Sequence, residues 1–316
     1  MRYLHWLWSV GLGLFLLGCS PASEPEVLGG DDVTRVVATV GMIGDLVERV
    51  AAGGAIEVTT LIQPGIDPHL YKPTRTDIGR LQAADVIFYN GLNLEGKMTQ
   101  AFEQAERAGA AVVAVGERLP ESRRLGDPER PTAADPHLWM DPSRWAGVVD
   151  VVADTLAEAS PGAEAEIRAN AAALSAELAE LDADAEATLA RVPTGRRVLV
   201  TAHDAFQYFG DRFDFEVLGV QGLSTESEAG VRDIERLVST LVDREVGAVF
   251  VESTVSSRNV EALIAGAAAR GHEVRIGGEL FSDAMGPAGT PEGTYGGMIR
   301  HNVDTIADAL GAGPGE

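Results

Sequence analysis

Short apolar runs alternate with stretches of helical period along most of the chain. Four runs in the first half are continuous enough for buried strands: Arg35–Val40, Ile56–Ile62, Ala84–Asn90 and Ala110–Val115. Between them, apolar residues recur every three or four positions, as in "MIGDLVERVAA". Strands that are apolar on both faces are typical of parallel sheets covered by helices on both sides. The pattern therefore predicts an α/β fold.

The same alternation restarts in the second half of the chain. Its predicted strands are Arg196–Ala202, Phe215–Val220, Gly247–Ser253 and His272–Gly278, again with helical stretches between them. Two rounds of the pattern predict two similar α/β domains, residues 33–160 and residues 194–316. Each domain is expected to contain a four-stranded parallel sheet.

A long segment rich in Ala, Leu and Glu connects the two halves. Residues 163–192 contain no Gly or Pro, and Pro161 and Pro193 flank them. As one helix this segment would span about 45 Å, which makes it a rigid rod rather than a flexible hinge. Residues 161–193 are therefore predicted to be a rigid linking helix. The pattern also fits a long surface helix within a single domain.

The N-terminal residues are typical of an export signal. Residues 1–18 carry Arg2, an apolar run and a small residue at the end, and the run is too short to span a membrane comfortably. The tetrapeptide "LLGC" ends at Cys19, the one cysteine of the chain, and resembles the bacterial lipoprotein box, in which the cysteine receives a lipid. A plain secretory signal is the alternative. Residues 19–32 are rich in Ser, Pro, Gly and acid, and we expect a flexible tether.

The net charge narrows the range of partners. The formal charge is −23 at pH 7, which argues against nucleic acid as a ligand and against docking on anionic lipids through a basic patch. A negative surface is compatible with a cation as ligand. We expect an exported protein, lipid-anchored on the outer face of the cell membrane or in the periplasm.

Histidines occur at unusual positions for so small a number. The chain has 6 histidines, and two of them end the same tripeptide, Asp67-Pro68-His69 and Asp135-Pro136-His137. Each of these lies in a segment that follows a predicted strand of the first half. His203 and Asp283 follow the first and the fourth strand of the second half. Because loops at the carboxyl ends of parallel strands form the ligand crevice, these four residues are expected to meet there.

Three imidazoles and a carboxylate suit a divalent first-row metal ion. Pro68 and Pro136 fix the backbone before their histidines, and Asp67 or Asp135 would orient an imidazole by hydrogen bonding. His272 and His301 are interpreted as structural. A secreted zinc hydrolase is the alternative function, but catalytic zinc keeps a position open for water, whereas four ligands would close a tetrahedron. An adhesin or structural lipoprotein would not explain the placement of the ligands.

Four segments carry a resemblance to a known family. These are "GIDPHLYKPT", "DPHLWMDP", "TAHDAFQYFG" and "LFSDAMGPAGTPEGTYGGMIRHNVDTI". With the lipoprotein box and the long helix, they resemble the zinc/manganese solute-binding proteins of bacterial ABC importers, the TroA-like group. The resemblance implies two α/β domains joined by one rigid helix, with one Zn²⁺ or Mn²⁺ ion as cargo in the cleft between them. It also implies ligation by His69, His137, His203 and Asp283.

The same resemblance implies partners and leaves the metal open. The partners would be an ABC permease and its ATPase, and the membrane through a lipid on Cys19; no enzymatic activity is expected, and the protein is expected to be a monomer. Zinc-dedicated members often carry a His-rich loop before the second ligand, and the corresponding stretch "GERLPESRRLGDPERPTAA" has no His. Manganese-dedicated or iron-dedicated members often have Glu at the third ligand, where this chain has His203. The two signals oppose each other, with zinc slightly favoured.

Overall fold

The computed structural model describes residues 33–127 and 133–311. The predicted signal, the tether and Cys19 lie outside the described residues, so their interpretation stays a prediction. Among the helices of the described ranges, none is both long enough and apolar enough to cross a membrane.

A four-stranded parallel sheet forms the centre of the first half, as predicted. Its strands are β1 (Thr34–Ala38), β2 (Ile56–Thr60), β3 (Val86–Tyr89) and β4 (Ala111–Ala114). The spatial order is β2-β1-β3-β4, and every neighbouring pair is parallel. The chain leaves β1 for β2 on one side and continues with β3 on the other. Such a reversal opens a crevice at the carboxyl ends of the strands.

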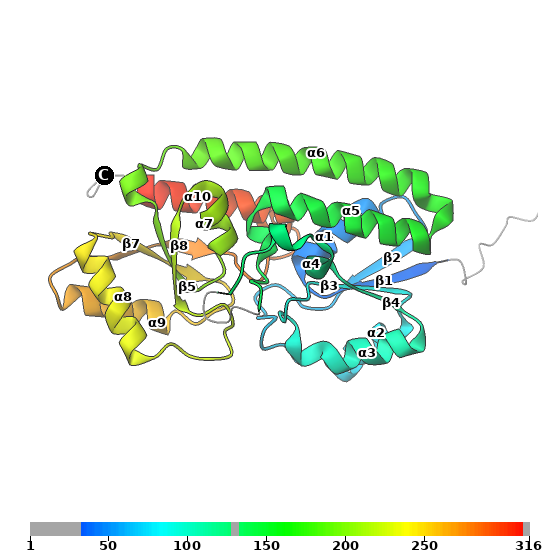
Figure 1. The fold of residues 1–316 in the computed structure, drawn as a ribbon, viewed down its shortest axis with the longest axis horizontal. Coiled ribbons are helices and arrows are strands. Elements are labelled where there is room, and N and C mark those ends of the chain that lie inside the picture. The colour runs from blue at the N-terminus through cyan, green and yellow to red at the C-terminus, as the bar shows by residue number, and fades with distance from the viewer. Residues whose placement is uncertain (1–32, 128–132, 312–316) are drawn as a thin grey trace, which may run out of the picture. The chain divides into compact units, whose positions relative to one another are not determined.

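Helices cover both faces of this sheet. They are α1 (Gly41–Val50), α2 (Arg75–Ala83), α3 (Thr99–Ala108), α4 (Val115–Arg118) and α5 (Pro142–Ala159). Helices α2 and α3 lie on one face, and α1 and α5 lie on the other (Figure 1). Local signals set the helix ends: Thr74 and Asp77 form a capping box at α2, and Asp141 accepts from the Ser143 amide ahead of α5.

The second half repeats the alternation with a different pairing of strands. Its elements are β5 (Val198–His203), α7 (Gln207–Phe213), β6 (Glu216–Gln221), α8 (Val231–Asp243), β7 (Ala248–Glu252), α9 (Arg258–Ala268), β8 (Arg275–Leu280) and α10 (Tyr295–Gly311). The prediction of a second four-stranded sheet was wrong. The described strands form two parallel pairs, β5-β6 and β7-β8.

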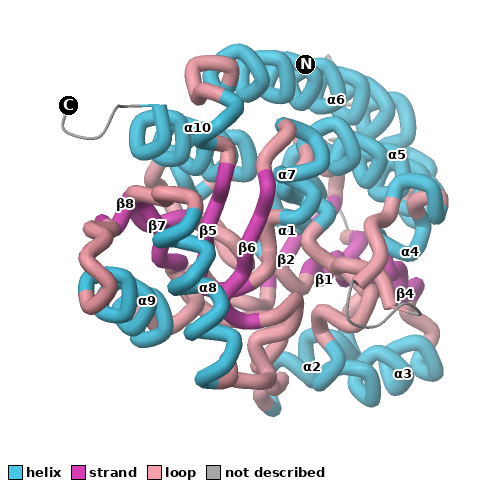
Figure 2. The backbone as a smooth tube through the Cα atoms, turned by 60° about the vertical axis from the view of Figure 1, so that its left-hand side comes forward, coloured by secondary structure: helices cyan, strands magenta, loops and turns pink. Residues whose placement is uncertain are grey.

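The side chain of Glu252 lies between the two strand pairs, at the ends of β5 and β7. The backbone amide of His203, the last residue of β5, donates to a carboxylate oxygen of Glu252 at the end of β7, at 2.8 Å. That amide is therefore paired with a side chain and not with a backbone carbonyl of a neighbouring strand. Strands β5 and β7 still lie next to each other in Figure 2.

The long predicted helix is present as α6 (Glu164–Leu189), with 26 residues. It is shorter than predicted because its first and last turns are replaced by a three-ten turn at Pro161–Ala163 and an irregular exit. A buried stripe recurs every three or four residues: Ile167, Ala171, Leu174, Leu178, Leu181, Ala185 and Leu189. This stripe packs on α5, α10 and α1, so one helix contacts elements of both halves (Figure 1). The division into two domains stays a prediction.

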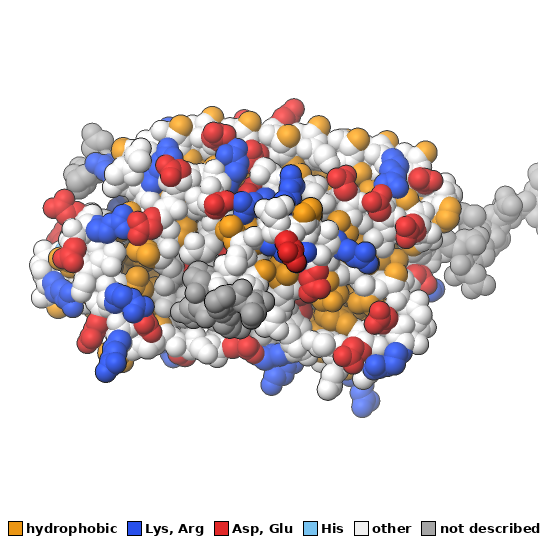
Figure 3. All heavy atoms as spheres, in the orientation of Figure 1, with side chains coloured by type: hydrophobic (Ala, Val, Ile, Leu, Met, Phe, Trp, Pro, Cys, Tyr) orange, Lys and Arg blue, Asp and Glu red, His pale blue; other side chains and the backbone are white. Residues whose placement is uncertain are grey.

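Short three-ten turns complete the described structure, at Gly96–Met98, Glu121–Arg123, Leu138–Met140, Pro161–Ala163, Thr194–Arg196 and Pro291–Gly293. One apolar core cluster runs from the first sheet through α6 into α7 and α10, and a second lies among β5, β7, α8 and α9. Acidic and basic side chains are interspersed over the face seen in Figure 3. Several charged side chains of the described chain form ion pairs, such as Arg212 with Asp182.

Candidate metal centre

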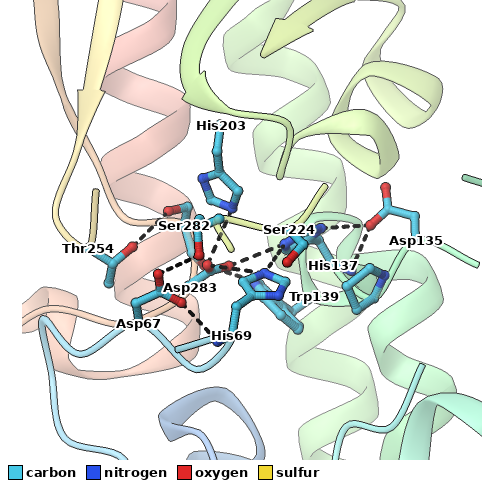
Figure 4. A network of polar contacts seen from close by, with 12 residues as sticks. Asp67, His69, Asp135, His137, Trp139, His203, Ser224, Thr254, Ser282 and Asp283 are labelled. Atoms are coloured by element: carbon cyan, nitrogen blue, oxygen red, sulfur yellow. Dashed lines mark hydrogen bonds and ion pairs between the residues drawn. The ribbon is translucent and has the colours of Figure 1, made fainter. Parts of the chain in front are cut away.

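The four predicted ligands lie together. His69, His137, His203 and Asp283 each offer one ligand atom, and these atoms all lie within 4.8 Å of one another. All four side chains are buried, and they come from four separate segments of the chain (Figure 4). The sequence prediction that these residues would meet is therefore correct as geometry.

His69 lies in the loop that follows β2, held by the residue two positions before it. Asp67 Oδ1 accepts a hydrogen bond from the His69 backbone amide at 2.8 Å. The expectation that Asp67 would orient the imidazole ring is not met, since its carboxylate binds the backbone and not the ring. The ring points instead to His137, with the two Nε2 atoms 3.4 Å apart.

His137 is held at two points by Asp135, as predicted. Asp135 Oδ1 accepts from the His137 backbone amide at 2.9 Å and lies 2.7 Å from the ring Nδ1. The surrounding segment is fixed from outside, because Tyr208 donates its hydroxyl to the Asp135 carbonyl at 3.0 Å and Asn90 donates its amide to the Pro136 carbonyl at 3.0 Å. The His137 loop is thus tied to both halves of the chain.

His203 is placed differently from the expectation. It is the last residue of β5 rather than a loop residue, and it is fully buried. Glu252 Oε2 lies 2.5 Å from the His203 Nδ1, and Glu252 Oε1 accepts the His203 backbone amide. Sequence reasoning missed Glu252. A signal was available, since a carboxylate at the end of an otherwise apolar strand needs a buried partner.

Asp283 follows β8 and lies at the centre of the three imidazoles. Its oxygens are 3.3 Å from His137 Nε2, 3.3 Å from His203 Nε2 and 3.6 Å from His69 Nε2. Both Asp283 oxygens and His203 Nε2 are buried without a hydrogen-bond partner among the described residues. A buried ionised carboxylate is costly unless a cation or several donors face it.

The surroundings shift the titration of these groups in opposite directions. Burial lowers the pKa of His69 to about 3, since its charged form would lose hydration beside two other imidazoles. Burial also disfavours charge on His137, but the carboxylates of Asp135 and Asp283 raise its pKa to about 9. Glu252 and Asp283 likewise raise the pKa of His203 well above its ordinary value in spite of burial.

The Asp283 carboxyl responds in the complementary way. Burial alone would raise its pKa, but the neighbouring imidazoles, His203 foremost, hold the pKa well below its ordinary value. The Asp283 side chain is therefore an anion that requires positive charge beside it. A divalent ion held between Asp283 and the three imidazoles would supply that charge.

The arrangement is chemically suited to ligate a cation through nitrogen and oxygen. A hydrogen on Nδ1 of His137 or His203 is donated to Asp135 or Glu252, which leaves the Nε2 lone pair of each neutral ring directed at Asp283. Three imidazole nitrogens and a carboxylate form a donor set typical of zinc and acceptable to other first-row divalent ions.

The two remaining described histidines are structural, as expected. His272 lies 2.8 Å through Nε2 from the Val246 carbonyl, and His301 lies 2.9 Å through Nε2 from the Glu279 carbonyl. His272 precedes β8 rather than beginning it, because that strand starts at Arg275. Neither histidine belongs to the cluster.

Comparison with known proteins identifies relatives over nearly the whole described chain. The family described as ZnuA, zinc-uptake complex component A, periplasmic, matches residues 36–309. The zinc-binding protein TroA of Treponema pallidum is 45% identical over 301 residues, covering 95% of this chain and 96% of that protein. The manganese-binding lipoprotein MntA of Bacillus subtilis is 43% identical over 296 residues, covering 93% and 95%.

A solved structure is similar in three dimensions as well. The periplasmic zinc-binding protein TroA from Treponema pallidum superimposes with a TM-score of 0.85 and 47% identity, covering 88% of this chain and 99% of that one. The α/β fold with parallel strands and one long helix is therefore shared with that protein. The chain belongs to this family of metal-binding solute-binding proteins, and its predicted function as the substrate-binding component of an ABC uptake system for zinc or manganese, rather than an enzyme, is confirmed.

Proposed function

We propose that this protein captures one divalent ion, zinc or manganese, with His69, His137, His203 and Asp283 as its ligands. Two of the ligands come from the first half of the chain and two from the second. A bound ion would therefore hold the halves together across the cleft between them. Release of the ion to a membrane permease would require these contacts to loosen.

The observation that carries this proposal is the buried Asp283 carboxylate, which faces three imidazole nitrogens. Its two buried oxygens make no hydrogen bond within the described ranges, and three imidazole nitrogens surround them at 3.3 to 3.6 Å. Such a group is costly in a merely structural core. A divalent ion bound there would satisfy both oxygens and all three nitrogens.

Zinc is favoured over manganese by the donor atoms. Imidazole nitrogen suits zinc, whereas manganese prefers oxygen donors. Manganese also binds such sites more weakly than zinc. The named relatives bind one or the other, as a zinc-binding TroA and a manganese-binding MntA. We therefore propose tighter binding of zinc in solution, with manganese as a second cargo where it is more available.

The remaining parts of the proposal concern location and partners. Lipidation of Cys19 would hold the protein on the outer face of the cell membrane or in the periplasm, with residues 19–32 as the tether. Two domains, residues 33–160 and 194–316, would be joined by the linking helix and act as a monomer. The partners would be the permease and ATPase of an ABC importer, in agreement with the relative named as a metal ABC transporter substrate-binding lipoprotein in Streptococcus mutans.

The test is metal content and calorimetric titration of the purified protein. One equivalent of zinc or manganese is expected in the parent. Asp283→Asn keeps the shape of the side chain and removes its charge, and should weaken zinc binding by more than about 100-fold, since even partners that only support a ligand account for 10 to 100-fold. Asp304→Asn, on the exposed face of α10, is the matched control. Equal binding by the parent and Asp283→Asn would overturn the proposed ligand set.

A further inference from the structure

The segment between β6 and α8 crosses from the second half of the chain to the first. We call residues 222–230 the strap. Its Thr225 donates a hydrogen bond through Oγ1 to Asp67 Oδ2 at 2.5 Å, a contact between residues 158 positions apart. The next residue, Glu226, lies 3.0 Å through Oε1 from Lys97 Nζ. Both contacts join the strap to the first half. In the contact with Asp67, the Thr225 side chain is buried.

The far end of the strap is fixed to its own half. Glu228 Oε2 accepts from Gln221 Nε2 at 3.1 Å and from Asn259 Nδ2 at 3.4 Å. Gln221 ends β6 and Asn259 lies in α9, so both donors belong to regular elements of the second half. The strap is therefore attached to the second half through Glu228 and contacts the first half through Thr225 and Glu226.

Asp67 connects the strap to a ligand of the proposed site. One of its oxygens binds Thr225, and the other accepts the backbone amide of His69 at 2.8 Å. The carboxylate is thus shared between the strap and the turn that carries His69. A displacement of the strap would therefore displace the His69 turn through the Asp67 side chain.

His69 also differs from the other two histidines in its support. The rings of His137 and His203 each have a carboxylate on Nδ1, from Asp135 and Glu252. Within the described ranges, the His69 ring makes no hydrogen bond with a carboxylate outside the ligand set. Its position therefore depends on its backbone, and the Asp67 carboxylate is the side chain that fixes that backbone.

We propose that Thr225 is a positioning residue for His69, and that the strap sets the rate at which the bound metal leaves. The inference rests on the proposed function, because it needs a metal bound by His69. Separation of the halves breaks the Thr225–Asp67 bond and frees the His69 turn, so His69 is the first ligand to leave. The Lys97–Glu226 pair is partly exposed and contributes less, since such pairs are weak and are screened by salt.

The experiment measures zinc dissociation from the full mature protein. Zinc-loaded parent, Thr225→Val, Thr225→Ser and Thr240→Val are mixed with an excess of a fluorescent zinc chelator, and the rate of release is recorded. Valine has the shape of threonine without the hydroxyl, and serine restores the hydroxyl. Thr240 is the control because its hydroxyl donates to the Arg236 carbonyl within α8. The association rate and the melting temperature of each metal-free protein are measured alongside.

Thr225→Val is expected to release zinc about tenfold faster, the effect of losing one hydrogen bond to a charged group. Thr225→Ser and Thr240→Val should release it at nearly the parental rate. The association rate should change little, and any fall in the metal-free melting temperature should be recovered in Thr225→Ser, because the Thr225–Asp67 bond is part of the fold itself.

Two results would contradict the proposed role of Thr225 alone, and a third would also contradict the proposed function. If the parent binds zinc and Thr225→Val releases it at the parental rate, Thr225 does not position His69. If Thr225→Val lowers the metal-free melting temperature and Thr225→Ser does not restore the release rate, the contact is only structural. A parent that takes up neither zinc nor manganese overturns the proposed function, and the strap with it.

Discussion

Glu252 holds His203 at two points, with Oε2 at 2.5 Å from the ring Nδ1 and Oε1 at 2.8 Å from the backbone nitrogen. Both side chains are fully buried. A carboxylate in this position fixes the orientation of the ring and increases the basicity of Nε2. Support of His203 is therefore built into the contact between β5 and β7.

Replacing Glu252 by Gln should weaken zinc binding by about 10 to 100-fold without unfolding the protein. The neutral amide is a weaker acceptor for the Nδ1 hydrogen and leaves Nε2 less basic. Calorimetric titration at pH 7.5 gives the affinity, and Glu279→Gln on the exposed side of β8 is the matched control. An unchanged affinity for Glu252→Gln, or an equal loss in the control, would show that this carboxylate does not support the ligand.

Replacing His203 should change the preference of the site between zinc and manganese. A glutamate there would lie beside Glu252, and two adjacent buried carboxylates repel each other. The useful variant is therefore His203→Glu combined with Glu252→Gln, compared with Glu252→Gln alone. It replaces a nitrogen donor by oxygen and should shift the affinity ratio from zinc toward manganese. Titration with each metal checks this, and a ratio that stays or moves toward zinc would contradict it.

Removing the His203 ring should weaken the binding of both zinc and manganese. His203→Ala also leaves the Glu252 carboxylate buried without its partner, which should destabilise the metal-free protein by about 1–3 kcal/mol. This cost is larger than for a loop residue, because His203 is a fully buried strand residue. Titration and urea unfolding measure the two effects. Parental affinity for both ions in His203→Ala would exclude His203 as a ligand.

Bound metal should stabilise the fold, and the effect should decrease at low pH. A ligand that binds only the native state adds about 4 kcal/mol at a thousandfold excess over Kd. Imidazole must be deprotonated to bind a metal, so the stabilisation should decrease as the pH falls and protons compete with the metal for the histidines. Melting temperatures with and without chelator at pH 7.5 and pH 5.5 test this. Indifference to chelator at pH 7.5 would count against the site.

Helix α6 should limit the motion that accompanies release. It has no Gly or Pro, its Asn170 donates to the Ala52 carbonyl near α1, and its Asp182 accepts from Arg212 on α7. Bending such a rod in its middle would break backbone hydrogen bonds. Small-angle scattering should give nearly the same radius of gyration with and without metal. A large difference in the radius of gyration would show that the two halves open widely about a hinge instead of tilting slightly.

Asp77 should contribute stability that depends on pH in a predictable direction. Burial would raise its pKa, but hydrogen bonds from Thr74 and Tyr71 hold the pKa below the ordinary value of 3.8. The unfolded chain then binds the proton more tightly, so the contribution is complete above that value and is lost as the pH falls through the lower folded pKa. Asp77→Asn should cost about 1 kcal/mol at pH 7.

The pH dependence separates this effect from simple loss of packing. In urea unfolding of the metal-free proteins, the difference between parent and Asp77→Asn should persist at pH 5 and shrink at pH 3. A difference that is already gone at pH 5, or constant to pH 3, would mean that the ionised carboxylate is not its source.

The sequence by itself determined the order of the elements and the position of the candidate ligands near the carboxyl ends of strands. Short apolar runs predicted the position of each described strand. Strand β3, at the centre of its sheet, is apolar throughout because helices cover both of its faces. The absence of Gly and Pro between Pro161 and Pro193 predicted α6. His69 and Asp283 follow strands, so the pattern placed each of them at the carboxyl edge of its own sheet.

Tertiary structure decided how those ligands are supported. Glu252 faces His203 across 49 residues and Thr225 reaches Asp67 across 158, and neither pairing leaves a trace in local periodicity. The pairing of the second-half strands as β5-β6 and β7-β8 was likewise not readable from periodicity. Periodicity reports which face of an element is buried. Which side chain faces which ring nitrogen is decided only when elements distant in sequence pack together, because hydrogen bonds depend on distances of a few tenths of an ångström.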